Sequence, residues 1–432
     1  MKSPNRMSST PKLPVSRGGA GVAVPASNGH GPNGEAHKTP PAENRSNFSL
    51  ILDHLIAFFT SLRLAVACLA LGMVLVFWGT LAQVDLGLLK AQNEFFRSFF
   101  VYWGPKGASW KIPVFPGGYL VGGVLLINLV ASHFKRFSLT RKKAGIWLIH
   151  FGLILLLLGQ LATDLLSRES FLHLREGQSK NYSESDRQFE LAIIDTSDAD
   201  SDKVVAIPEA LLARQKEIQH PELPFTLRVH EFLPNSVVQQ LATNSLAPPA
   251  ASRDIGSQAT VREVPRETQM DRRDRPSTVV ELITPQGSQG TWLLSDYVEG
   301  PQAFSVNNRN YEMVLRLRRY YEPFSIQLLK FTHEVYPGTD TPKNFASRVQ
   351  LQNQQTGENR EVQIYMNNPL RYAGETFYQA SLDPDDHGTV LEVVHNPSWL
   401  TPYFSCVLVG VGLVVQFATH LFGFAFKRRK TA

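Results

Sequence analysis

The sequence predicts a membrane protein with four transmembrane helices and a large antiparallel β-sandwich-like domain between the third and the fourth. Three observations predict this fold class: four long apolar segments, one long segment with β-type patterning, and an uneven distribution of charge. Residues 167–400 carry a net charge of −9, whereas the rest of the 432-residue chain carries +14. Such a separation indicates that the two parts face different compartments. Because the largest polar segment is acidic, no nucleic-acid partner is expected.

The first 50 residues are predicted to be a disordered cytoplasmic tail. Residues 1–47 contain seven prolines and six glycines but no Phe, Trp or Tyr. A segment of this composition cannot bury enough apolar surface to offset the entropy lost on folding.

Four segments have the length and composition of transmembrane helices. They contain runs of 21, 23, 20 and 34 residues without a charge. About 20 such residues cross a hydrocarbon core of ~30 Å as a helix, and soluble core helices rarely run so long without a charge. The predicted helices cover residues 62–84, 117–134, 144–166 and 401–426.

The basic residues predict that both termini lie in the cytoplasm. The loop 135–143 holds five bases and no acid, and the short tail 427–432 holds four bases. Loops rich in Lys and Arg stay on the cytoplasmic side of a membrane. Four helices with both ends inside place residues 167–400 outside the cytoplasm.

Residues 167–400 are predicted to form this extracytoplasmic β-rich domain. Short runs rich in β-branched and aromatic residues alternate with turn signals, a spacing typical of an antiparallel sandwich or an open barrel. A helical pattern is found only near residues 209–217, and residues 240–276 predict a long polar insertion or loop. The predicted strands cover residues 189–194, 225–232, 278–283, 311–318, 324–331, 346–352, 360–366, 376–380 and 389–394.

Motifs of the common enzyme classes are missing from the sequence. It contains no GxxxxGK[ST], GxGxxG, GxSxG or HExxH pattern, so nucleotide binding, Ser-hydrolase and zinc-protease chemistry are unsupported. The two cysteines, Cys68 and Cys406, are too far apart for a CxxC pair or a self-ligated haem. The histidines of the outer domain do not pair at metal-ligand spacing. The outer domain is therefore expected to bind or scaffold rather than to catalyse a reaction.

Two histidines lie well inside the predicted helices. His150 is seven residues past the basic loop and His420 is seven residues before the basic tail, so each lies about 10 Å inside the cytoplasmic boundary. Ionisable groups at this depth are costly and usually functional, and neutral imidazole is an axial ligand of haem iron. The alternative for both is a hydrogen bond to a neighbouring helix. His133, beside Lys135, is interpreted as an interfacial residue.

A stripe of small residues fixes the faces of the third predicted helix. Gly145, Gly152 and Gly159 recur every seven residues and predict a close seam with another helix. His150 lies about 160° around the helix from Gly152. It is therefore expected to point away from the seam, toward a ligand or another subunit, because lipid is the unfavourable choice.

Three stretches together resemble the ResB family of System II cytochrome c biogenesis. Residues 61–65 leading to 79–83 resemble the family's first helix, and residues 150–159 resemble its His-containing third helix. Residues 368–381 resemble the family's NxPLxYxGxxxYQxS segment before the last helix, which is the most specific of the three signals. The resemblance covers roughly residues 55–426.

This resemblance implies a partner role in a cytochrome c synthetase of the bacterial inner membrane. With a CcsA-type (ResC) membrane protein, such proteins carry haem b, held transiently and non-covalently, across the membrane and present it to apocytochrome c. The resemblance implies that His150 is an axial ligand of the haem iron, with His420 a weaker candidate. The chain itself is expected to be a non-catalytic subunit, and thiol reduction is expected to need other proteins nearby.

Some alternatives stay open at this point. Arg371 is a candidate for contact with a haem propionate, and its alternative is a structural arginine in a β-turn. The second axial ligand comes either from the CcsA-type partner or from His420. A haem-free, membrane-anchored β-domain scaffold for an envelope complex is the rival function, whereas a transporter is disfavoured because the chain has only four spans and no repeated halves.

Overall fold

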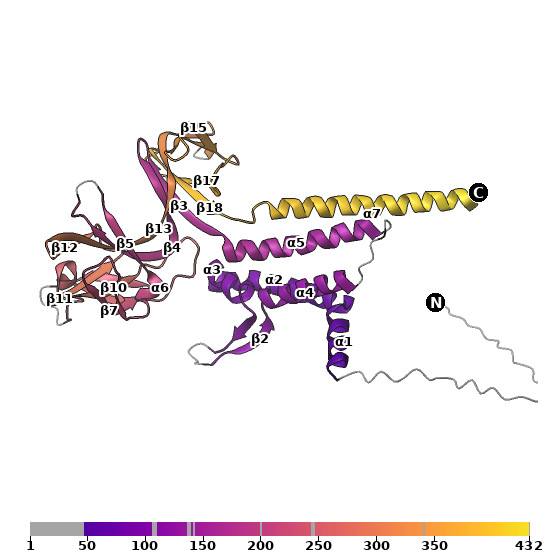
Figure 1. Cartoon of the computed structure of the whole chain (residues 1–432), viewed down its shortest axis with the longest axis horizontal. Helices are drawn as coiled ribbons and strands as arrows, with labels where there is room; N and C mark the ends of the chain where they lie inside the picture. The colour runs from indigo at the N-terminus through magenta and orange to yellow at the C-terminus, as the bar shows by residue number, and fades with distance from the viewer. Residues whose placement is uncertain are drawn as a thin grey trace, which may run out of the picture. The chain divides into compact units, whose positions relative to one another are not determined.

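A computed structural model describes residues 47–105, 110–135, 140, 143–198, 201–242, 247–339 and 342–431, and Figure 1 shows its helices and strands. Most of the tail that the sequence predicts to be disordered, residues 1–50, therefore lies outside the described residues. Its last four residues begin helix α1 (Asn47–Phe59). The chain divides between Leu52 and Asp53, and all later elements belong to the second part.

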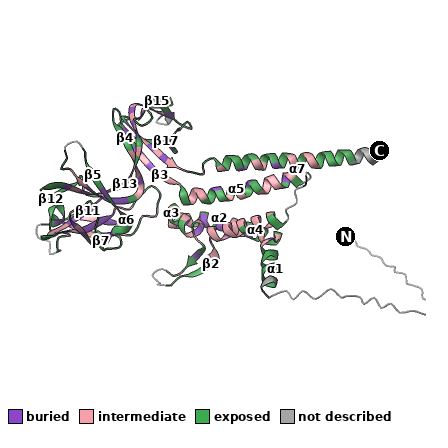
Figure 2. Cartoon of the chain, viewed as in Figure 1, coloured by how far each residue is buried: buried purple, intermediate pink, exposed green. Residues whose placement is uncertain are grey.

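Among the described residues, four helices are long and apolar enough to cross a membrane. Their exposed side chains are largely Leu, Val and Phe, as the exposed colour along the helices in Figure 2 illustrates. Lipid is the stable environment for such surfaces, so the chain is a multi-pass membrane protein. The helices are α2 (Leu62–Leu86), α4 (Gly118–Lys135), α5 (Ala144–Leu166) and α7 (Thr401–Thr431). The backbone of α7 continues to Thr431, so most of the predicted basic tail, 427–432, is the end of this helix.

The glycine stripe of α5 forms the predicted seam, and its partner is α7. A Cβ atom on Gly145 would lie 2.6 Å from the backbone nitrogen of Gln416, and one on Gly152 would lie 2.8 Å from a methyl carbon of Val409. At Gly159 the corresponding distance, to a methyl carbon of Thr401, is 2.4 Å. The two helices therefore run antiparallel at a separation that only glycine permits on α5.

A short irregular segment and a hairpin connect α2 to α4. After α2 come α3 (Leu88–Ala91) and a π-helical turn, η1 (Gln92–Phe96), and then the strands β1 (Phe100–Trp103) and β2 (Ile112–Pro116), which pair in antiparallel fashion. Val101 and Phe95 are buried with Leu75 of α2, so the segment folds back along that helix. The sequence predicts only a loop for residues 85–111, so the packing of this segment along α2 is not predicted.

The β domain lies between α5 and α7 in the chain and is built on one large antiparallel sheet. Its strand order is β15-β14-β13-β4-β3-β18-β17-β16, with β12 beside β13 and β5 beside β4. Strand β15 also contacts β17, so the sheet is nearly closed. The strands are β3 (Arg168–Arg175), β4 (Ser179–Asp195), β5 (Lys203–Pro208), β12 (Gln302–Val306), β13 (Arg309–Val335), β14 (Pro342–Asn353), β15 (Glu358–Tyr365), β16 (Leu370–Tyr372), β17 (Glu375–Leu382) and β18 (Gly388–His395).

One strand, β13, supplies side chains to both main cores of the domain. Its first half packs Met313 and Leu315 into the core shared with the small sheet, and its second half packs Ile326 and Leu328 into the core inside the nearly closed sheet. The sequence predicts two strands here, 311–318 and 324–331, and this prediction is wrong. The pattern breaks at Pro323, where the structure has only a shift of register against β4, because proline is tolerated at irregularities of a ladder.

The second layer of the sandwich is a small antiparallel sheet of order β11-β10-β7-β6. Its strands are β6 (Glu217–Ile218), β7 (Thr226–Leu233), β10 (Ser277–Thr284) and β11 (Gly287–Ser295). The helix that the sequence predicts over 209–217 is only the four-residue α6 (Glu209–Leu212), and the chain then continues into β6.

The polar insertion, residues 240–276, is more than the loop that the sequence predicts. It contains a 3-10 helix, η3 (Asp254–Gln258), and the strand β9 (Ala259–Glu263), which pairs with β8 (Ser236–Gln240). Ala251 and Ala259 are buried against Val279 and Leu293 of the small sheet. Small alanines within a largely polar segment contribute to this core, and composition alone does not reveal them.

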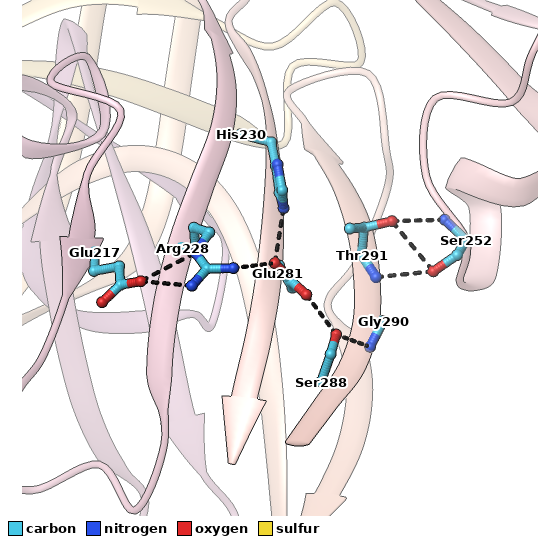
Figure 3. Close-up of polar contacts among 8 residues, drawn as sticks. All are labelled: Glu217, Arg228, His230, Ser252, Glu281, Ser288, Gly290 and Thr291. Atoms are coloured by element: carbon cyan, nitrogen blue, oxygen red, sulfur yellow. Dashed lines mark hydrogen bonds and ion pairs between the residues drawn. The ribbon is translucent and has the colours of Figure 1, made fainter. Parts of the chain in front are cut away.

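Figure 3 shows a polar network on the small sheet, centred on Glu281 of β10. The Glu281 carboxylate accepts hydrogen bonds from the Ser288 hydroxyl (2.6 Å), from His230 Nε2 (2.9 Å) and from Arg228 Nη1 (3.3 Å). The Ser288 bond, followed by the bond from His230, holds the pKa of Glu281 below its ordinary value. Arg228 also donates to Glu217 of β6, so the network links neighbouring strands.

The free edge of β11 is covered by the insertion. The backbone N–H of Ser252 donates to the Thr291 hydroxyl at 2.8 Å, and the backbone N–H of Thr291 donates to the Ser252 hydroxyl at 2.9 Å (Figure 3). An uncovered edge strand is a template for pairing with another chain. The insertion therefore protects this edge.

Candidate functional site

The end of α5 next to the basic loop 135–143 holds His150, the residue singled out by the sequence. Its ring is half-buried, and Nδ1 lies 2.8 Å from the carbonyl oxygen of Ile146, one turn earlier in the same helix. A carbonyl oxygen can only accept, so Nδ1 carries the ring proton and Nε2 keeps its lone pair. Among the residues that the structure describes, none hydrogen-bonds to Nε2. This tautomer leaves His150 ready to ligate a metal through Nε2.

His133 of α4 lies at the same end of the helices. Its ring packs edge-on against the ring of Trp147, with the centroids 4.4 Å apart. Trp147 lies three residues before His150 in α5, so His133 packs about one helical turn from the level of His150. The interpretation of His133 as an isolated interfacial residue therefore overlooks a contact between helices. A signal was present in the sequence, because His133 and Trp147 lie close to opposite ends of the short basic loop, and antiparallel helices bring such positions level.

His420 of α7 is placed differently. Its side chain is exposed, and its Nε2 lies 2.7 Å from Nε2 of Gln416, one turn earlier. The amide nitrogen donates, so the lone pair of His420 Nε2 is already engaged. The other amide atom, Gln416 Oε1, is buried and has no hydrogen-bond partner among the described residues.

The two intramembrane histidines are too far apart along the helices to ligate one iron. In the seam, Gly145 lies opposite Gln416 and Gly152 lies opposite Val409, which places His150 level with Val411. His420 is nine residues further along α7, or roughly 13 Å at 1.5 Å per residue. The structure therefore does not bring the two candidate ligands together.

Arg371 lies near the opposite end of α5. It is an exposed residue of β16, and its guanidinium carbon lies 4.0 Å from the ring centroid of Trp399, just before α7 begins. This stacking is a cation–π contact and gives Arg371 a structural role. Thr163 of α5 bonds to Ser398 beside that tryptophan, so Arg371 and His150 are separated by roughly 20 Å along α5.

A polar cluster closes the end of the helices that is next to the β domain. Asp164 of α5 accepts a hydrogen bond from Arg97 Nε at 2.8 Å and another from the Tyr119 hydroxyl of α4. These residues, with Ser167 and Glu169, line a cavity of about 300 Å³. Asp164 thus ties α5 to the start of α4 and to the segment after α2.

A second polar cluster joins the first strand of the β domain to its last two. The Glu375 side chain, only 4% exposed, accepts hydrogen bonds from Arg168 Nη2 (2.9 Å) and from His395 Nδ1 (3.0 Å). Arg168 and Glu375 both lie opposite His395 in the register of three neighbouring strands. Burial, followed by the charge of Glu375, raises the pKa of the nearby Glu322 carboxyl. Glu375 falls within residues 368–381, the segment with the most specific resemblance. Its contact with Arg168 is not predictable from the sequence, because the two residues lie far apart in the chain.

Comparison with known proteins adds two findings. Residues 287–390, which run from β11 into β18, match the model of the ResB-like family. Protein NrfI of Wolinella succinogenes is 24% identical over 295 residues, which cover 68% of this chain and 29% of that protein. The chain therefore spans only about 29% of the length of the curated relative that it matches.

The family match covers the strands that close the large sheet, and the similarity to NrfI extends over two thirds of the chain. Both agree with an architecture of four apolar helices and an antiparallel β domain between the last two. In its fold and in these matches, the chain is similar to ResB-like proteins.

Proposed function

We propose that this chain acts in cytochrome c biogenesis as the subunit that receives haem from the cytoplasmic side and carries it across the membrane. The observation that supports the proposal most directly is the state of His150. Its Nδ1 proton is bonded within its own helix, and its Nε2 lone pair has no hydrogen-bond partner among the described residues. In an apolar membrane environment a lone pair without a hydrogen bond is costly, and coordination to iron removes that cost.

The surroundings of His150 suit haem as a cargo. Haem is flat and apolar with two carboxylates, and a neutral imidazole is a standard axial ligand for its iron. Trp147 and His133 offer ring surface beside His150. The loop 135–143 contributes five bases to the same end of the helices, where propionates would need positive charge.

The second axial ligand is proposed to come from a CcsA-type (ResC) partner. His420 is a poor source, because its Nε2 is engaged by Gln416 and it lies roughly 13 Å along α7 from the level of His150. Arg371 remains a proposal for a propionate contact at the outer face. Its stacking on Trp399 leaves its N–H groups without a hydrogen bond or ion pair to any described residue.

The chain is proposed to present haem b rather than to form bonds to it. Attachment to apocytochrome c requires reduced thiols, and both cysteines of this chain lie in membrane helices, Cys68 in α2 and Cys406 in α7. Covalent attachment is therefore assigned to the complex with the CcsA-type partner, and thiol reduction to other proteins nearby.

The test of this function is the absorption spectrum of the full chain purified together with a CcsA-type partner. A Soret band that is present in the complex and depends on this chain is the expected result. A complex that forms but has no Soret band, when haem is supplied during growth, would favour the rival function of a haem-free scaffold.

The proposed orientation places the β domain on the extracytoplasmic side of the bacterial inner membrane. Reporters fused after Arg141 and after Lys430 are expected to be active only as cytoplasmic reporters, and a reporter fused near Gly290 only as an external one. The reason is that the five bases of the loop 135–143 should hold it inside. Alkaline phosphatase and green fluorescent protein fusions measure this, and a cytoplasmic signal at Gly290 would contradict the orientation.

A further inference from the structure

The hairpin of β1 and β2 exposes a set of apolar and aromatic side chains that the proposed haem function does not use. Each of the six is at least 42% exposed. A two-stranded hairpin is only marginally stable alone in water, and apolar surface gathered on so small an element marks an interaction site. The residues are Phe100, Tyr102, Trp103, Trp110, Ile112 and Val114.

The base of the hairpin lies beside the part of α2 that spans the membrane. Trp78 of α2 contacts Phe95 and Phe115 edge-on, with ring centroids 5.5 and 5.9 Å away. A Cβ atom on Gly79 would lie 2.8 Å from the ring of Phe96. Gly79 is seven residues before the end of α2, at Leu86, or about 10 Å inside that end. The base is therefore at the depth of the acyl chains of one leaflet.

The leaflet in question is the one next to the β domain. Arg97 and Tyr119, which flank the hairpin in sequence, both bond to Asp164 at the end of α5. Strand β3 of the β domain begins at Arg168, four residues later. In Figure 1 the hairpin that contains β2 extends away from the side of α2.

The composition of the two strands fits lipid better than water or an aqueous partner. Neither strand contains a charged residue. Strand β2 carries Pro113 and Pro116, which have no N–H group and so reduce the number of unpaired donors along its free edge. Unpaired backbone donors are the main cost of placing a strand edge in a membrane. Tyr102 and Trp103 are of the residue types that prefer the boundary between acyl chains and headgroups.

We propose that this hairpin is inserted into the boundary region of the leaflet on the β-domain side, as a lateral membrane anchor for α2 and α4. The occupant of its apolar face is lipid. The proposal rests on the packing of the hairpin and its composition, and it holds whether or not the chain carries haem.

The test uses spin labels on the full-length chain in nanodiscs of phosphatidylcholine and phosphatidylglycerol. Cys68→Ala and Cys406→Ala remove the native thiols, and Val114→Cys or Tyr102→Cys introduces a single label. Oxygen concentrates in the acyl region, whereas a nickel chelate stays in water. Val76→Cys, an exposed position on α2, calibrates lipid, and Ser288→Cys, an exposed position on β11, calibrates water.

Labels at Val114 and Tyr102 are expected to collide with oxygen about as often as the label at Val76. They should collide with the nickel chelate roughly tenfold less often than the label at Ser288, because polar solutes partition poorly into hydrocarbon. Collision with nickel at the Ser288 level would show a hairpin in water and overturn the proposal. Protection from both reagents would show that protein covers the hairpin, and this outcome also overturns it.

Discussion

Replacing His150 with glycine is expected to abolish cytochrome c maturation and to remove most of the haem that co-purifies with a CcsA-type partner. The imidazole holds its Nδ1 proton on the Ile146 carbonyl and offers a free Nε2. Glycine removes the ligand, and iron would then have to be held by the partner's ligand alone. Loss of an outer-shell contact alone costs about 10- to 100-fold in metal affinity. Loss of a whole axial ligand should therefore lower the haem content of the complex by about tenfold or more.

Imidazole added to the growth medium or to the membranes is expected to restore part of the haem in the His150→Gly complex, because it can occupy the vacated position. The readouts are the Soret band of the purified complex and the amount of covalently attached haem in a reporter cytochrome c. His420→Ala is the matched control within the membrane. Its effect should be small because Gln416 already engages the His420 nitrogen.

Two outcomes would contradict different parts of this assignment. A His150→Ala complex that keeps its full Soret band and matures cytochrome c normally contradicts the assignment of His150. If His420→Ala lowers the haem content as much as His150→Ala does, the offset of roughly 13 Å between the two histidines along the helices is not maintained in the complex.

Replacing Gly145 with leucine is expected to produce a large loss of stability in the membrane region. A Cβ atom there would lie 2.6 Å from the backbone nitrogen of Gln416 and 2.7 Å from the backbone oxygen of Gly412. Backbone atoms of a helix cannot move aside as a side chain can, so α5 and α7 must separate. Overpacking of this kind costs about 1–3 kcal/mol or more, and here it also removes the close approach that holds membrane helices together.

Gly410→Leu is the control for this prediction. Gly410 is an exposed residue of the same helix pair, and a Cβ atom there meets nothing within 4 Å. Thermal unfolding in detergent, followed by the monodispersity of the purified protein, should show a clear fall for the Gly145 variant and little change for the control. Equal effects of the two substitutions would contradict the seam.

The membrane helices are predictable from the sequence because a run of about 20 uncharged residues has few stable environments other than a bilayer. The seam is predictable for a related reason. Gly145, Gly152 and Gly159 follow a period that keeps them on one face, and the structure confirms that this face packs against α7. The faces of a helix follow from geometry, which is why the sequence could also single out His150 as a residue away from the seam.

Features that depend on contacts distant in sequence are not predictable in the same way. The break at Pro323 looks like the end of a strand, although β13 continues past it because neighbouring strands hold its register. Arg371 stacks on Trp399, a contact made by the folding of β16 toward the start of α7. The hairpin escapes prediction because its short strands gain their order from packing on Leu75 of α2.

The pairing of β3 with β18 has a consequence for the synthesis of the chain. Strand β3 follows α5 directly and β18 nearly adjoins α7, so the first and last strands of the domain are neighbours. The 234 residues between Leu166 and Thr401 must be translated before α7 emerges, which takes on the order of 10 to 50 s at typical rates. Throughout that interval the glycine face of α5 contacts lipid and one edge of β3 is unpaired. A nascent chain that stalls before residue 388 leaves both surfaces open, so the arrival of β18 and α7 completes the β domain and the membrane region in a single step.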